Sequence, residues 1–432
     1  MTRIKFHKKL YWLSFCAFII NACLTFQLSN LTLLLKSAGA SSFLIPLVWL
    51  IPPITGMIIQ PLVGYLSDIH TSRFGKRKPY ILVWGLGAGL SFLLLPLYQN
   101  LLLIIFFTFL IDISLNGSAE SLRALLADQV TVEKERVNAF SIYAFFTGLG
   151  GLFGAFLPFI SRSFIYKEAA SEMPELISAT YLFCGSLMLV AIALFLFYRE
   201  KPIKTEPSAQ NGFTDHLQGL FAKIRLDFFK ILLIHSLSWF GIFLFWLYFS
   251  LYIEQIHYAE FNALAMKTKM NALGMDISFY FSIYQLIGLL FTLLVPVLAK
   301  KYPLELVHSF CLVLGGIGIF IISCAQDQAS LITALCLVGF FWGSLISIPY
   351  IIILKLMPQN RMGTYLGVFN ISITFPQIMG GFISPFVYNL VQQRAGAMLT
   401  IAAVSIILSG VIWFYMYRDE FMIKKKVIIE RE

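Results

Sequence analysis

Charged residues are scarce in this 432-residue chain. They make up 12% of it, whereas hydrophobic residues make up 59%, and the mean hydropathy is +0.81. A soluble protein of this length could not bury so much apolar surface in one core. Apolar runs of about 20 residues recur with short gaps, which is the spacing of helices that cross a bilayer. The sequence therefore predicts a multi-pass protein of the lipid bilayer.

Sequence signatures of catalysis and metal binding are also lacking. There is no phosphate loop, no nucleophile elbow and no cluster of metal-ligand spacing, so we expect neither an enzyme nor a cofactor. The six cysteines lie in apolar runs without a C-x-x-C pair, and we expect them to be buried small hydrophobic residues. They are Cys16, Cys23, Cys184, Cys311, Cys324 and Cys336.

Acidic residues are fewer than basic ones, 22 against 32, which gives a net charge of +10. The Lys and Arg residues lie between the apolar runs, so the charge reports membrane topology and not nucleic-acid binding. With the N-terminus in the cytoplasm, 25 of these residues fall on the cytoplasmic side, six fall outside and Arg123 falls within a span. We therefore expect both termini in the cytoplasm. The Lys-, Ile- and Phe-rich composition, with no targeting signal, suggests a bacterial inner membrane.

Twelve apolar runs between residues 10 and 418 predict an all-α membrane protein with twelve transmembrane helices. The widest polar gap divides them six from six, with Pro202 and Pro207 typical of a linker. The expected parts are an N-terminal half (1–198), a cytoplasmic linker (199–228), a C-terminal half (229–418) and a cytoplasmic tail (419–432).

A weak internal repeat supports two related halves. "EKERVNAFSIYAFFTGLGGLFGAFLP" and "PQNRMGTYLGVFNISITFPQIMGGFISP" lie about 225 residues apart. Each has an Arg near its start, Arg136 or Arg361, and ends in a Gly-rich stretch with a Pro. Two pseudo-symmetric six-helix halves are the architecture of the major facilitator fold, which places its substrate site near the midplane between the halves.

Three longer blocks resemble known transporters. "GYLSDIHTSRFGKRKPY" resembles the signature between spans 2 and 3 of major facilitator proteins, with three extra residues inside it. "DISLNGSAESLRALLAD" in span 4 and "GVFNISITFPQIMGGF" in span 11 are similar to blocks of the sucrose transporters and of the glycoside–pentoside–hexuronide cation symporters. With shorter matches, the blocks cover about a quarter of the chain.

The first of these blocks contains four basic residues within six positions. Part of this charge holds the loop in the cytoplasm. The resemblance implies in addition a conformational latch that favours the outward-open state and breaks when the halves rock. The latch residues would be Gly64, Asp68, Arg73, Gly75 and Arg77. The alternative is that the cluster serves topology alone.

Span 4 carries the strongest chemical signal, because Asp112, Glu120 and Arg123 lie in a segment that must cross lipid. Asp112 and Arg123 are eleven residues apart, so they project from one face of a helix, about 16 Å apart along its axis. We predict Asp112 as the proton-coupling carboxylate and Arg123 as a ligand of polar substrate oxygens, roles that the resemblance also implies. A buried network that only fixes helix packing is the alternative. Glu120 is placed to neutralise Arg123 as an i,i+3 pair, and its role stays open.

Further substrate-binding candidates are polar or aromatic residues within spans. They are Asn116, Gln27, Asn370, Gln377 and Trp239. Amides suit sugar hydroxyls, although interhelical hydrogen bonds are an equal alternative. An aromatic run that also includes Phe243, Trp246 and Tyr248 offers rings for stacking on a sugar, or for packing alone. We expect His235, near the start of span 7, at the membrane interface.

One departure from the sucrose-transporter pattern lies after span 7, where plant-type members carry an acidic–aromatic and Arg–Glu cluster. Here Leu251 and Gln255 stand at the matching positions. This weakens sucrose itself as the substrate and leaves the transport class unchanged.

These observations predict a proton-coupled symporter that imports a sugar or glycoside, most simply a neutral sugar, by alternating access and acts as a monomer. Sodium is the alternative coupling ion. Two other functions stay open. One is the same fold carrying a siderophore, an amino-acid derivative or a drug, in either direction. The other is a receptor or scaffold that does not transport.

Overall fold

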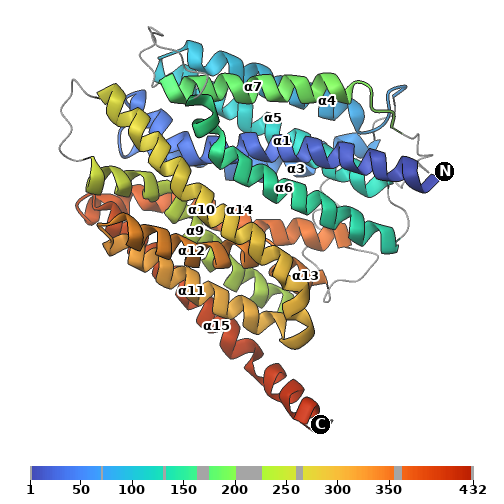
Figure 1. Ribbon diagram of the computed structural model, residues 1–432, viewed down its shortest axis with the longest axis vertical. Helices are drawn as coiled ribbons and strands as arrows, with labels where there is room; N and C mark the ends of the chain where they lie inside the picture. Colours follow the sequence, from blue (N-terminus) through green and yellow to red (C-terminus); the bar gives the residue numbers. More distant parts are fainter. Residues whose placement is uncertain are drawn as a thin grey trace. The chain divides into compact units, whose positions relative to one another are not determined.

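The computed structural model describes residues 2–69, 72–129, 133–162, 175–200, 226–258, 266–354 and 362–429 (Figure 1). These residues form helices joined by turns, without a strand, which confirms the all-α prediction. The helices of the first part are α1 (Thr2–Ser37), α2 (Leu44–Val48), α3 (Ile51–Ile69), α4 (Lys78–Leu94), η1 (Leu95–Leu97), α5 (Leu101–Gln129), α6 (Glu133–Arg162) and α7 (Glu175–Phe195). The helices of the second part are α9 (Leu226–His257), α10 (Met266–Lys301), α11 (Leu304–Cys324), α12 (Gln328–Leu345), α13 (Ile348–Leu354), α14 (Met362–Leu390) and α15 (Ala395–Ile429).

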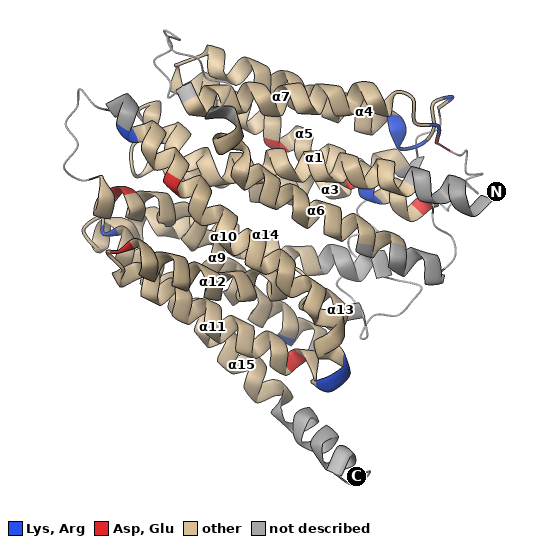
Figure 2. Ribbon diagram, viewed as in Figure 1, with Lys and Arg blue, Asp and Glu red and all other residues tan. Residues whose placement is uncertain are grey.

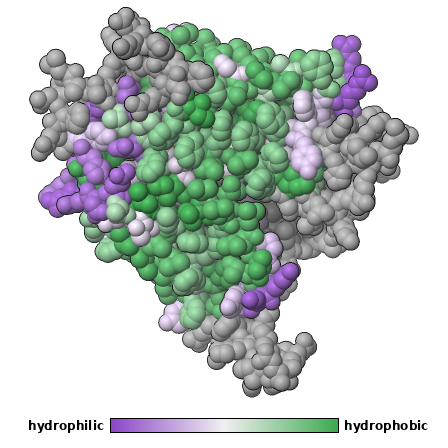
Figure 3. Space-filling view, in the orientation of Figure 1, coloured by the Kyte–Doolittle hydropathy of each residue, from purple (hydrophilic) through white to green (hydrophobic). Residues whose placement is uncertain are grey.

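The helices have the length and composition of membrane spans. Within the described ranges, 11 segments are long and apolar enough to cross a bilayer. A twelfth long helix, α14, spans 29 residues and includes Asn370, Gln377 and two prolines. Charged residues lie mostly near the helix ends (Figure 2), and the visible face is largely apolar with hydrophilic residues at its margins (Figure 3). Hydrogen bonding within each helix satisfies the backbone where lipid offers no partner.

The chain divides into two compact units. The N-terminal unit comprises the described residues of Met1–His216 and Glu260–Phe279, and the C-terminal unit those of Leu217–Ala259 and Tyr280–Glu432. Of the predicted linker, residues 201–225 lie outside the described residues, and α15 continues through most of the predicted tail.

Three helix pairings recur in both units. In the N-terminal unit α6 packs along α1, whereas α5 and α7 both pack on α4. In the C-terminal unit α14 packs along α9, whereas α12 and α15 both pack on α11. Each pair of the N-terminal unit matches the pair formed by the spans six positions later in the chain: α1–α6 matches α9–α14, α4–α5 matches α11–α12, and α4–α7 matches α11–α15. The pairing therefore has the pseudo-symmetry that the fold-class prediction expects.

Glycines of α6 bring α6 and α1 into backbone contact. A Cβ atom at Gly150 would lie 2.2 Å from the carbonyl oxygen of Phe18, and one at Gly154 would lie 2.2 Å from that of Ala22. The Asn21 side chain donates a 2.7 Å hydrogen bond to a backbone carbonyl of α6 beside this contact. Close backbone approach at small residues is a common way for helices to associate in lipid.

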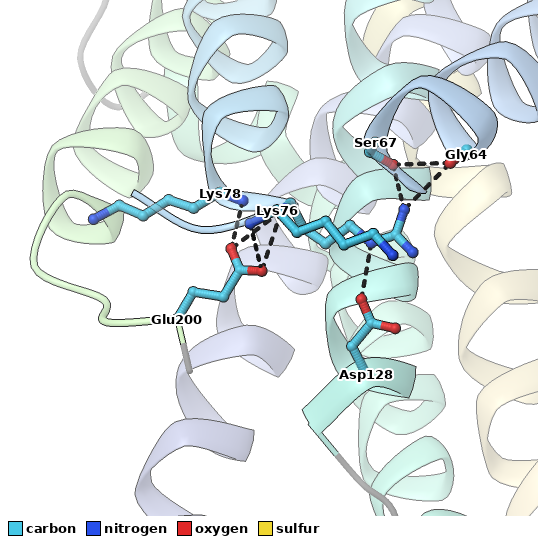
Figure 4. Close-up of polar contacts among 7 residues, drawn as sticks. Gly64, Ser67, Lys76, Lys78, Asp128 and Glu200 are labelled. Carbon is cyan, nitrogen blue, oxygen red and sulfur yellow. Dashed lines mark hydrogen bonds and ion pairs between the residues drawn. The ribbon is translucent and has the colours of Figure 1, made fainter. Parts of the chain in front are cut away.

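The N-terminus of α4 is held by a carboxylate from the end of α7. Glu200 accepts hydrogen bonds from the backbone N–H groups of Lys76, Arg77 and Lys78 at 2.8–3.1 Å (Figure 4). The first N–H groups of a helix have no intrahelical acceptor, and the helix dipole favours a negative charge there. Glu200 therefore satisfies three donors of the loop and first turn at once.

Lys78 makes the reciprocal contact at the end of α7. Its Nζ donates to the carbonyl oxygens of Leu196 and Tyr198 at 2.7 and 2.9 Å. These carbonyls belong to the turn that follows α7, which ends at Phe195. Glu200 and Lys78 thus join the N-terminus of α4 to the segment after α7 by two reciprocal contacts.

Gly75 makes room for Glu200. Its φ is +113°, a conformation that L side chains rarely adopt, and a Cβ atom there would lie 2.2 Å from Oε2 of Glu200. Glycine is therefore required at this position for two reasons: the backbone turn has a positive φ, and the carboxylate of Glu200 occupies the space of a Cβ atom.

The cysteines follow the prediction only in part. Cys16, Cys23, Cys184 and Cys311 are buried, but Cys324 is exposed and Cys336 is partly so. Hydropathy does not separate the two groups, because a residue that faces lipid is as apolar as one that faces protein.

The α1–α6 contact predicts that Gly154→Ala destabilises the protein by about 1–3 kcal/mol, because the methyl group would overlap the backbone of α1. Thermal unfolding of the purified protein in detergent measures the effect. Gly64→Ala is the matched control, since a Cβ atom there meets its nearest atom only at 4.0 Å. Equal stability of the two variants would contradict the packing described.

The Gly75–Glu200 contact predicts coupling in a double-mutant cycle. Gly75→Ala alone should cost stability through both backbone strain and overlap with Glu200. In a Glu200→Ala background the overlap with the carboxylate is gone and only the contact with Cβ of residue 200 remains, so the same substitution should cost about 1 kcal/mol less. Thermal unfolding of the four proteins gives the coupling energy. Strict additivity would show that Glu200 does not occupy this place.

Candidate functional site

Asp112 of α5 lies in the interior of the N-terminal unit. Its exposed fraction is 0%. Gln27 of α1 donates from Nε2 to its Oδ2 at 3.1 Å. The other oxygen, Oδ1, has no hydrogen-bond partner within the described part of the chain, and neither has Oε1 of Gln27. A carboxyl group in a bilayer-spanning helix thus has one fixed donor and one oxygen available for a proton.

Asn116 extends this polar group to α3. Its Nδ2 donates to the backbone carbonyl of Asp112 at 2.9 Å and to Thr55 at 3.2 Å. Its Oδ1 accepts a 2.9 Å hydrogen bond from Gln60. Gln27 and Asn116, which the sequence singled out, thus both lie beside Asp112. Thr55 and Gln60 were missed, although a lone amide within an apolar run was a usable signal for Gln60.

Arg123 is more accessible than Asp112 and contacts other groups. Its side chain is 48% exposed and forms the expected i,i+3 pair with Glu120 at 2.9 Å. Asp112 and Arg123 therefore form two polar centres on one helix.

Arg77 ties the loop after α3 to the end of α5. It is buried, and its Nε pairs with Asp128 at 2.9 Å. Its Nη1 donates to the carbonyl of Gly64 at 3.3 Å and to the hydroxyl of Ser67. Figure 4 shows Asp128 reaching from α5 toward this loop. Asp128 thus braces this loop.

The other predicted latch residues outside the helix caps are Gly64, Asp68 and Arg73. The side chain of Asp68 lies outside the described residues. Arg73 is exposed, with its guanidinium 4.7 Å from the ring centroid of Phe74. A Cβ atom at Gly64 would make only an ordinary contact with Glu120. Close helix approach therefore does not require glycine there. The latch role of all five residues stays a prediction.

Three tryptophans form a cluster in the C-terminal unit, which we call the tryptophan platform: Trp239, Trp246 and Trp342. Their ring centroids lie 5.5–6.2 Å apart in edge-to-face contacts. Trp239 and Trp246 are on α9, and Trp342 comes from α12. The sequence did not predict Trp342 as a member of this cluster, because helical spacing groups only residues of the same helix.

A polar side chain of α10 borders this platform. The indole N–H of Trp342 donates to Oε1 of Gln285 at 3.0 Å, and Gln285 is nearly buried in α10. On α14, Gln377 is buried and Asn370 is partly exposed. The other two aromatic residues of the predicted run pack elsewhere. Phe243 lies against Gly380, and Tyr248 contacts Tyr388 at 4.9 Å.

The interfacial prediction for His235 is wrong. Its exposed fraction is 0%, and its ring contacts Ser372, Phe369 and Trp239. The error has a physical reason, since α9 begins at Leu226 and so places His235 more than two turns inside the helix.

Gln255, where sucrose transporters carry an Arg, closes the turn between α14 and α15. Its Nε2 donates to the carbonyl of Gln393 at 2.8 Å, and its Oε1 accepts from the backbone N–H of Ala395 at 3.0 Å. Gln392 and Gln393 both have positive φ, 54° and 57°. The amide therefore supports a strained turn.

Comparisons with known proteins agree with this architecture. The family model described as Major Facilitator Superfamily matches residues 10–381. Sucrose transport protein SUC4 of Arabidopsis thaliana is 23% identical over 82% of this chain and 79% of its own length. Human proton-associated sugar transporter A is 35% identical over 33% of this chain, and the match spans only 22% of the human protein.

A solved structure, that of a point mutant of the nucleoside transporter NupG, has the same fold. It superposes with a TM-score of 0.74 at 13% identity and covers 94% of this chain and 99% of its own. The fold and the family match together make the assignment. The chain belongs to the major facilitator superfamily and is a multi-pass membrane transporter, not an enzyme.

Proposed function

We propose that this protein is a proton-coupled symporter that imports a neutral sugar or glycoside by alternating access. The observation that carries the proposal is the buried carboxyl group of Asp112, with Gln27 on one oxygen and no partner on the other within the described residues. The names of two relatives, a sucrose transport protein and a proton-associated sugar transporter, support both the proton and the sugar.

Asp112 couples the proton through the cost of its charge. A bare carboxylate at the centre of a membrane helix costs about 2.5–3.5 kcal/mol on insertion scales, and a protonated carboxyl group avoids that cost. Gln27 donates to Oδ2, which leaves Oδ1 to hold the proton. When the surroundings of Asp112 open to water on the inside, the carboxylate becomes hydrated and the proton leaves.

The sugar is bound by uncharged groups and one cation. Aromatic rings stack on the apolar face of a sugar, and amides match its hydroxyl groups as donors and acceptors. Trp239, Asn370 and Gln377 provide these groups in the C-terminal unit. Asn116 and Gln27 provide amides in the N-terminal unit, where Arg123 offers donors that stay charged.

The latch and the topology complete the proposal. Gly64 and Asp68 lie on α3, and Arg73 and Gly75 lie in the loop that follows it, which Arg77 and Asp128 brace. The distribution of Lys and Arg supports both termini in the cytoplasm. The protein acts as a monomer in a bacterial inner membrane, with protons as the coupling ion in place of sodium.

Asp112→Asn tests the coupling role. Asparagine has nearly the same shape but cannot carry the proton, so sugar accumulation driven by a pH gradient should fall to simple equilibration while exchange of labelled for unlabelled sugar persists. Proteoliposomes with and without an imposed gradient measure both. Asp327→Asn, the same change at the exposed cap of α12, should behave as the wild type. Gradient-driven accumulation at the native rate in Asp112→Asn would refute the role.

Asp68→Asn tests the latch. If Asp68 contributes about 1.4 kcal/mol to the balance between the outward-open and inward-open states, its loss should change the rate of uptake about tenfold. The topology-only alternative predicts normal insertion and unchanged uptake, because the basic residues are retained. Uptake per inserted molecule, quantified on the same membranes, separates the two.

A further inference from the structure

His235 lies in a chain of hydrogen bonds that leads to the tryptophan platform. The indole N–H of Trp239 donates to its Nε2 at 3.0 Å. Its Nδ1 lies 2.9 Å from the hydroxyl oxygen of Ser372. That hydroxyl in turn donates to the backbone carbonyl of Phe369 at 2.6 Å. All four residues belong to the C-terminal unit, on α9 and α14.

The direction of these bonds fixes the form of the imidazole. An indole N–H can only donate, so Nε2 of His235 must present a lone pair. The ring proton is therefore on Nδ1, which donates to Ser372. Ser372 directs its own hydrogen to Phe369, so its oxygen is free to accept. Every donor has one acceptor, and the ring is the neutral Nδ1–H tautomer.

Ring contacts hold the imidazole in the same orientation. Its centroid lies 4.5 Å from that of Phe369, with 22° between the planes. It meets Trp239 edge to face at 6.0 Å. The imidazole thus has a stacked partner on one side and a perpendicular partner on the other. Rotation about its χ angles would break both hydrogen bonds and both ring contacts together.

We infer that His235 is a positioning residue that holds the indole of Trp239 at a fixed angle in the platform and thereby sets the apparent affinity for sugar. Both ring nitrogens are engaged, so His235 itself offers no group to a substrate. A stacking ring contributes most when its plane is fixed before the ligand arrives. The sugar part of this inference rests on the proposed function, whereas the hydrogen-bond chain does not.

Two isosteric variants separate the two nitrogens. The amide oxygen of His235→Gln reaches the position of Nε2 and can accept from Trp239. The amide of His235→Asn reaches only the position of Nδ1 and can bond Ser372 alone. Both variants remove the imidazole, and Asn leaves a cavity one methylene larger than Gln does. The indole N–H signal of Trp239 therefore separates loss of this bond from loss of packing.

The experiment combines spectroscopy and transport on the full chain. NMR of protein labelled with ¹⁵N-His and ¹⁵N-Trp in detergent reports the tautomer of His235, assigned by His235→Gln, and the indole N–H of Trp239, assigned by Trp239→Phe. Uptake of radiolabelled sucrose into proteoliposomes gives KM and kcat for the wild type and both variants.

We expect the Nδ1–H tautomer in the wild type, and a Trp239 signal that is kept in His235→Gln and displaced in His235→Asn. KM for sucrose should rise about fivefold in His235→Asn, the factor expected for one hydrogen bond, and stay near native in His235→Gln, with kcat unchanged in both.

An Nε2–H tautomer in the wild type, which needs no variant to detect, or equal KM values in the two variants would overturn the inference. If the wild type takes up no sucrose, its sugar is another one, and the tautomer and the Trp239 signal decide the assignment of His235 without the transport measurement.

Discussion

The hydrogen bond from Gln27 holds the carboxyl group of Asp112 in the protein interior, from which water is excluded. This constraint governs the rest of the N-terminal unit, because a buried charge must be paired, hydrated or neutralised. The polar residues around Asp112 are amides and hydroxyls, with no cation paired to its carboxylate within the described ranges. A carboxyl group without a fixed counter-ion is suited to gaining and losing a proton. That property connects the packing of α1 and α5 to the proposed coupling.

Charged side chains near the ends of the helices, unlike Asp112, have fixed partners. Glu200 caps the N-terminus of α4, Lys78 bonds carbonyls of the turn after α7, and Arg77 pairs with Asp128 of α5. The loop between α3 and α4 is therefore tied to α5 and to the segment after α7 in its own unit. A latch built on this loop would therefore act from a rigid base, and its moving contacts would involve the residues left over, Asp68 and Arg73.

The fold could be predicted from the sequence because the bilayer leaves few choices. Long apolar runs become helices, because the backbone must satisfy its own hydrogen bonds in lipid. Asp112, Glu120 and Arg123 stood out for the same reason, as charges within a span, and the i,i+3 pair followed from helix geometry alone.

The rest depends on contacts between distant segments. Glu200 caps α4 from more than 120 residues away, and Trp342 joins Trp239 from another helix. His235 was misplaced because the start of α9 could not be read from hydropathy, which does not distinguish a buried face from a lipid-facing one. Gln255 could be recognised as a departure from the sucrose transporters, but its role in the turn after α14 required the structure.

Proton movement that accompanies sugar entry tests the central claim most directly. Proteoliposomes loaded with a pH-sensitive dye and held without an imposed gradient would receive sugars from a panel of neutral mono- and disaccharides. The account predicts that a transported sugar acidifies the interior as it enters, with or without sodium. Sugar entry that leaves the internal pH unchanged, or that requires sodium, would contradict it.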